Sequence, residues 1–179
     1  MLQKGLTKIE IEEICEEIEL QWDYHLMVRA IFYSKFPNQD DFYSPSFYSV
    51  RGISFHVILP KVKSERFSRA AKGIPVWLNQ NYVLRLYGIL DSKELIKLGK
   101  ETDSKIIQLV TILRMNVGSH STGRRVSKRS ELRKATKLTN SLLGREIDLD
   151  KVNVFTLSID SVLLPLKNQV INFVKSLEL

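Results

Sequence analysis

The stretch SKIIQLVTILRMNVGSH, residues 104–120, decides how the rest of the chain is interpreted. Its apolar residues recur at three- and four-residue steps, which is the spacing of one face of an α-helix. The residues on that face are Ile106, Val110, Leu113 and Val117. We therefore predict an amphipathic helix over residues 104–118, with this stripe packed into a core.

The same helical spacing recurs on both sides of this segment. We predict a long helix over residues 6–36, either continuous or divided near Trp22, and ended by Pro37. Further helices are predicted over 75–90, with Pro75 in the first turn, and over 127–143, with Gly144 as the C-terminal cap. A last helix begins or bends near Pro165 and carries Leu163, Leu166, Val170, Phe173 and Leu177.

Two segments between these helices are less regular. Residues 47–59 have the β-branched and aromatic content of a strand, but Pro60 and the lack of strand partners favour a helix. Residues 146–158 are expected to be extended. With no internal repeat or linker, the prediction is one domain, residues 1–179, folded as an all-α bundle of five or six helices.

Composition limits the class of protein. The apolar fraction is 44% and the charged fraction is 26%, as in ordinary soluble domains, and no apolar run is long enough to span a membrane. The single cysteine, Cys15, excludes an intrachain disulfide framework. Residues 1–13 lack a secretory signal pattern, so we expect a cytoplasmic protein. No cluster of His, Cys, Asp and Glu has metal-ligand spacing, so we expect neither a metal nor a cofactor.

Charge is unevenly distributed along a chain whose net charge is +7. Residues 10–19 contain six glutamates and no basic residue, which is typical of a solvated helix face. Residues 124–137 contain seven basic residues and one acid, Glu131. Because this basic run begins just after His120, we interpret it as a binding surface for a polyanion.

Arg114, Asn116 and His120 are the candidate catalytic residues. Arginine is a permanent cation whose fork of donors suits phosphate oxygens, and histidine exchanges a proton near neutral pH. On an ideal helix Arg114 and Asn116 lie at opposite edges of the apolar stripe, and His120 would lie one turn beyond Asn116. Either Gly118 ends the helix and redirects His120 toward Arg114, or the two residues meet from different subunits.

The run from Leu113 to His120 resembles the R-x(4–6)-H motif of HEPN domains, helical proteins of prokaryotic toxin, CRISPR and defence systems. Two further stretches, residues 82–91 and 157–166, occur in the order seen in stand-alone HEPN-like proteins. The resemblance covers residues 75–179. In many family members the residue after the arginine is polar, whereas here it is Met115.

The resemblance implies a metal-independent endoribonuclease, related to toxins or defence and usually a homodimer with both motifs lining one cleft. His120 would act as general base or acid, Arg114 would stabilise charge on the phosphate, and Asn116 would orient either group. The flanking RNA backbone would be bound by Arg124, Arg125, Lys128 and Arg129. An antitoxin or a nucleotidyltransferase-type protein is a further expected partner.

Other interpretations stay open at this point. The motif residues also suit a non-catalytic HEPN-like module that binds nucleotide, RNA or a partner protein, and Met115 favours that reading. A helical scaffold in which the motif only shapes a dimer is a third alternative. His120 suits a helix end and Arg114 suits the rim of an apolar stripe without any catalysis. His25 and His56 are interpreted as packing residues, and Trp22, Trp77, Tyr82 and Tyr87 as core or interface aromatics.

Overall fold

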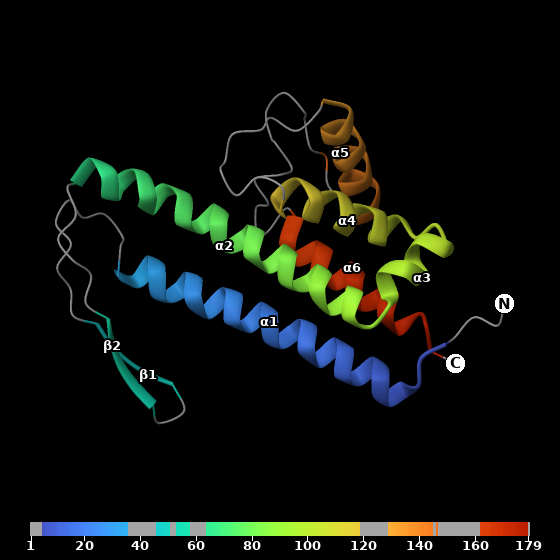
Figure 1. Ribbon diagram of the computed structural model, residues 1–179, viewed down its shortest axis with the longest axis horizontal. Helices are drawn as coiled ribbons and strands as arrows, with labels where there is room; N and C mark the ends of the chain where they lie inside the picture. The colour runs from blue at the N-terminus through green and yellow to red at the C-terminus, as the bar shows by residue number, and fades with distance from the viewer. Residues whose placement is uncertain are drawn as a thin grey trace.

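Six helices and one β-hairpin make up the part of the chain that the structure describes (Figure 1). The computed structural model describes residues 5–35, 46–50, 53–57, 64–118, 129–144, 146 and 162–178. In chain order the elements are α1 (Lys8–Lys35), β1 (Ser46–Val50), β2 (Ile53–Val57), α2 (Ser64–Ser92), α3 (Leu95–Glu101), α4 (Lys105–Gly118), α5 (Arg129–Leu143) and α6 (Leu164–Lys175). The prediction of a helical bundle of five or six helices is confirmed by the six described helices, the β-hairpin departs from it, and a HEPN-like arrangement stays a prediction.

The two longest helices, α1 and α2, run antiparallel and side by side (Figure 1). α1 begins with a capping box, in which the Thr7 backbone N–H donates to Glu10 Oε2 at 2.8 Å and the Glu10 N–H donates to Thr7 Oγ1 at 3.3 Å. It continues without a break past Trp22, so the predicted long helix is a single one. Its core side contains Ile11, Ile14, Ile18, Trp22 and His25, all buried.

The predicted start of the second long helix at Pro75 is wrong. α2 begins at Ser64, so Pro75 lies well inside it. An interior proline removes one backbone hydrogen bond and usually disfavours a helix. Here Arg29 of α1 donates to the Pro75 carbonyl oxygen at 3.3 Å and to Asn79 Oδ1 at 2.8 Å, which ties α2 to α1 at this level. Tertiary contacts therefore outweigh the local preference of proline.

The predicted helix over residues 47–59 is also wrong. β1 and β2 form an antiparallel hairpin in which Tyr48 is opposite Phe55 and Val50 is opposite Ile53. The β-branched and aromatic residues that suggested a strand do form strands. The missing strand partners that argued against this assignment are supplied by the two halves of the segment itself.

α4 is confirmed as predicted and lies among the other helices of the bundle (Figure 1). Ile106, Val110 and Leu113 of its predicted stripe are buried; the side chain of Val117 lies outside the described residues. The short helix α3 was not predicted. It packs closely on α4, because a Cβ atom added to Gly99 would overlap the side chain of Ile107.

The last two helices follow the prediction. α5 ends at Leu143, and Gly144 after it has a φ of 60°, the left-handed conformation of a glycine cap. α6 has Pro165 in its first turn, and the chain after it pairs with the start of the molecule, where the Leu6 N–H donates to the Leu177 carbonyl at 3.0 Å. The predicted extended segment, residues 146–158, lies outside the described residues apart from Glu146.

Buried residues from all six helices form one hydrophobic cluster. None of the helices in the described ranges is both long enough and apolar enough to cross a membrane.

Candidate functional site

Arg114 is exposed near the C-terminal end of α4, at the margin of the buried stripe. Its guanidinium carbon lies 5.0 Å from the centroid of the Tyr87 ring, which comes from α2. This is the distance of a cation–π contact, worth about 0.5–1 kcal/mol at an exposed site. The half-buried tyrosine therefore orders a cation at the surface. Within the part of the chain that the structure describes, Arg114 forms no salt bridge.

The other predicted catalytic residues are only partly placed. Asn116 belongs to α4, but its side chain lies outside the described residues, and so does the whole of His120. The structure therefore does not test whether Arg114, Asn116 and His120 come together. α4 is described as far as Gly118, and the projection of the helix from Gly118 to His120 stays a prediction.

Most of the predicted RNA-binding residues also lie outside the residues that the structure describes. Arg124, Arg125 and Lys128 lie there entirely, and Arg129 is placed only as the first residue of α5. The later members of the basic run are described, and Arg133, Lys134 and Lys137 are all exposed on α5. The α5 residues Ala135, Thr136, Thr139 and Leu143 are buried instead. The cations thus form a solvated face on a helix that packs against α4.

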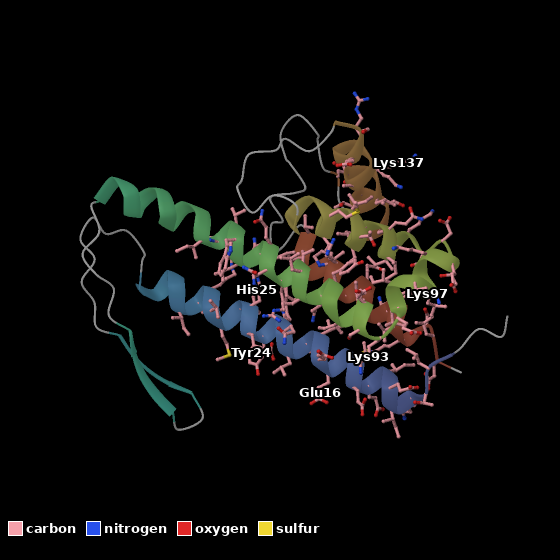
Figure 2. All side chains as sticks on the ribbon, viewed as in Figure 1. Glu16, Tyr24, His25, Lys93, Lys97 and Lys137 are labelled. Carbon is pink, nitrogen blue, oxygen red and sulfur yellow. The ribbon has the colours of Figure 1, made fainter. Side chains whose placement is uncertain are left out.

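A second cluster of chemical groups lies between α1 and α2. Trp22, His25 and Tyr82 are buried, and their rings stack in a triangle with centroid distances of 5.1–5.6 Å. Figure 2 shows His25 on the side of α1 that faces α2. His25 Nε2 and the Tyr82 hydroxyl are both buried without a hydrogen-bond partner among the described residues. Two orphaned polar atoms in one aromatic cluster are unusual in a protein core.

Burial dominates the protonation of this cluster. Burial lowers the pKa of His25 to about 4, the nearby Arg29 charge lowers it further, and a backbone hydrogen bond at Leu78 acts in the opposite direction. Burial also raises the pKa of Tyr82, with a smaller contribution from the charge of Glu19. At neutral pH both groups are uncharged and closed off from solvent. The prediction that His25 is a packing residue is confirmed, and His56 has no described side chain.

The aromatic residues divide between core and surface. Trp22 and Tyr82 are core residues, as predicted, and Tyr87 is half-buried beneath Arg114. Trp77 is 61% exposed on α2, so it is not a core residue; the predicted alternative of an interface aromatic stays open.

One charged pair was missed by the sequence analysis. Lys167 of α6 is buried, and its ammonium donates to both carboxylate oxygens of Glu19 on α1, at 2.7 and 2.6 Å. The same ammonium lies 5.8 Å from the ring centroid of Trp22. A signal was present, because Lys167 falls between Leu163, Leu166 and Val170 on the apolar stripe of α6. A cation buried in that place needs an anionic partner, here the half-exposed carboxylate of Glu19.

The described side chains include no group of three or more His, Cys, Asp or Glu residues that could hold a metal ion. Comparison of the chain with protein-family models, with curated proteins and with solved structures gave no match in any of the three. The function is therefore inferred from the residues of the chain itself.

Proposed function

We propose that this protein is a metal-independent endoribonuclease that cleaves RNA with Arg114, Asn116 and His120. One observation carries the proposal: an exposed guanidinium is held over Tyr87 near the end of α4, six positions before His120. An arginine with no acidic partner among the described residues, ordered at the surface, is suited to bind an anion.

The Tyr87 contact also suits the guanidinium to phosphate. The ring of Tyr87 covers one face of the planar cation, whereas the N–H donors of a guanidinium point outward in its plane. A phosphate can therefore approach those donors while the ring stays in place. Because the side chain is already ordered, less conformational entropy is lost on binding.

Cleavage then follows from the chemistry of the proposed residues. His120 takes the proton of the ribose 2′-OH, and the 2′-oxygen forms a bond to the adjacent phosphorus. The bond from phosphorus to the 5′-oxygen breaks, and that oxygen takes a proton from solvent. Arg114 stabilises the negative charge that grows on the phosphate oxygens, and Asn116 orients His120 or the phosphate. The products are a 2′,3′-cyclic phosphate and a 5′-hydroxyl.

The cations after α4 complete the proposed RNA surface. Arg124, Arg125 and Lys128, between α4 and α5, and Arg129, the first residue of α5, would hold the flanking phosphates. Each phosphate contact releases counterions, so binding should weaken steeply with salt. We propose that Arg124→Ala combined with Arg125→Ala reduces this salt slope without unfolding the protein. An unchanged slope would mean that these cations are only a solvated surface.

The test is RNA cleavage by the purified chain in EDTA, followed by analysis of the product ends. Wild-type protein should give 2′,3′-cyclic phosphates. Arg114→Ala should lower the rate by about 10²–10³ and His120→Ala by about 10²–10⁴. Lys105→Ala is the matched control, since it removes an exposed cation from the other end of α4. Products with 5′-phosphates that form only with added magnesium would contradict the proposal.

The Tyr87→Leu variant distinguishes the effect of ordering the Arg114 side chain from the effect of its charge. This change keeps an apolar side chain against the core but removes the ring beneath Arg114. The lost contact of about 0.5–1 kcal/mol corresponds to a rate loss of about two- to fivefold. A rate loss as large as that of Arg114→Ala would show that Tyr87 has some other role.

We further propose that the site is shared between two subunits of a homodimer. Each of the variants Arg114→Ala and His120→Ala should be inactive alone, because each lacks one half of the site. In a mixed dimer, one of the two sites combines an intact Arg114 with an intact His120. Co-refolding the two variants should therefore restore part of the activity. Mixed dimers that form but stay inactive would place the complete site within one chain.

A non-catalytic module is the second candidate, and Met115 is the observation that favours it. Its side chain is 56% exposed directly after Arg114, where an apolar group does nothing for phosphate chemistry. Such a module would bind RNA in an Arg114-dependent manner without cutting it. Retained RNA binding by wild-type protein, with no cleavage in EDTA or in magnesium, would select this alternative.

A further inference from the structure

A second apolar stripe runs along α1, on the side opposite the core. Leu20, Tyr24, Met27 and Ile31 follow one another at steps of four, three and four residues, which keeps them on one helix face. The core residues of α1 near this level, Ile18, Trp22 and His25, lie on the other side. Figure 2 accordingly shows Tyr24 on the side of α1 away from α2, and His25 on the side toward α2.

The stripe is well exposed for apolar side chains. The exposed fraction is 39% for Leu20, 47% for Tyr24, 45% for Met27 and 48% for the adjacent Val28. Single exposed apolar residues are normal, but four of them on neighbouring positions of one helix form a patch. Tyrosine and methionine are also enriched in the cores of protein interfaces.

Trp77 of α2 is a further exposed aromatic residue, but it lies outside this patch. Arg29 donates to Pro75 and to Asn79, so the part of α2 between those two residues lies at the level of residues 28–29 of α1. Trp77 stands in that part of α2, but the helical turn places it about 160° from Asn79, on the side of α2 away from α1. We call Leu20, Tyr24, Met27 and Val28 the outer α1 face.

The charge around this face has the opposite sign to the chain as a whole. The net charge of the chain is +7, yet α1 contains seven acidic residues and three basic ones. Glu16, Glu17 and Asp23 are exposed and lie on α1 beside the apolar stripe. An apolar stripe with acidic borders is complementary to a helix that has an apolar stripe with basic borders.

We propose that the outer α1 face binds an amphipathic, positively charged helix of another protein. A second copy of this chain fits the face less well. Pairing two α1 helices would bring together two surfaces of the same negative charge, and like charges at an interface are costly. A basic helix instead pairs its Lys and Arg side chains with Glu16, Glu17 and Asp23, while its apolar side covers Tyr24 and Met27.

Isothermal titration calorimetry of the full chain with a synthetic helix tests the proposal directly. The probe is a synthetic helical peptide of about 20 residues, long enough to form a helix, with leucines at helical spacing, lysines elsewhere and no aromatic residue. Added to the full chain, it should give a saturable heat of binding with one peptide per chain. A peptide with glutamates in place of the lysines should not bind.

Variants then locate the binding site. Tyr24→Ala combined with Met27→Ala should weaken peptide binding at least about tenfold, since central interface side chains carry most of the binding energy. Leu164→Ala is the matched control, because Leu164 is an exposed apolar residue of α6. Trp77→Phe is a second control and should leave peptide binding unchanged, because Trp77 lies on the side of α2 away from α1.

Three results would overturn the proposal. The first is that the lysine peptide does not bind, and the second is that both peptides bind equally well. The third is that the double variant binds the lysine peptide as tightly as wild-type protein does. A fourth concerns the second copy: if the chain is a dimer in solution that Tyr24→Lys dissociates, the outer α1 face is a self-association surface. None of these outcomes depends on whether the protein cleaves RNA.

Discussion

The buried His25 should make the stability of the protein depend on pH in a predictable direction. In the folded chain burial lowers the pKa of His25 to about 4, whereas the ordinary value is 6.5. Between these values the unfolded chain binds a proton at this residue and the folded chain does not. Protons therefore favour the unfolded state, so stability is complete above pH 6.5 and falls as the pH drops toward 4.

The size of the effect follows from the two pKa values. One pKa unit corresponds to about 1.4 kcal/mol, so the full loss approaches about 3 kcal/mol near pH 4 and is about 2 kcal/mol at pH 5. The stability of a domain is only about 5–15 kcal/mol, so this loss is easily measured. Because the side chain is 7% exposed, solvent screening should reduce it little.

Urea unfolding, followed by circular dichroism between pH 5 and pH 8, measures this contribution. The comparison is with His25→Gln, which keeps a polar side chain that does not titrate. His56 and His120 are present in both proteins, so their titration cancels in the difference. The free energy of unfolding of wild-type protein should fall by about 2 kcal/mol more than that of the variant. Parallel pH profiles would refute the reasoning, because they would mean that His25 is protonated equally in both states.

Two pairs of substitutions test the packing of the bundle by chemical denaturation. Gly99→Ala should lower the free energy of unfolding by about 1–3 kcal/mol, because the added Cβ atom would overlap the side chain of Ile107. Gly88→Ala adds a Cβ atom that meets no other atom within 4 Å, so it should stabilise α2 by about 0.5–1 kcal/mol. Equal effects of the two changes would contradict the close approach of α3 to α4. Glu19→Ala leaves the buried Lys167 ammonium without its carboxylate and should cost up to about 3 kcal/mol, while Lys167→Met should change stability by less than about 1 kcal/mol. The reverse order would mean that Lys167 does not need Glu19 in the folded state.

Helices with a local apolar period were predictable from the sequence. Ile106, Val110 and Leu113 revealed α4, and Ile11, Ile14 and Ile18 revealed α1, because a helix places residues three and four apart on one face. α3 was missed since it contains only seven residues, too few for a period to show.

The two errors in the fold have a common physical cause. For β1 and β2 the residue types favoured a strand, but a helix was predicted because no second strand was recognised. The two strands that pair are in fact adjacent in the sequence. For Pro75 the local signal was a helix start, but the hydrogen bonds of Arg29 hold α2 to α1 there. In both cases pairing between segments decided the outcome, and pairing is not a local property.

The candidate site shows the same division between local and long-range information. The exposure of Arg114 follows from its position beside Leu113, at the edge of a buried stripe, and that much was visible in the sequence. Its partner Tyr87 was not, because the register between α2 and α4 decides which aromatic ring lies beneath the guanidinium. The ring of Tyr87 matters for function because it orders the Arg114 side chain before phosphate binds. An arginine that only extends into solvent would lose conformational entropy when it binds phosphate. The Tyr87→Leu variant measures this contribution separately from the charge of Arg114.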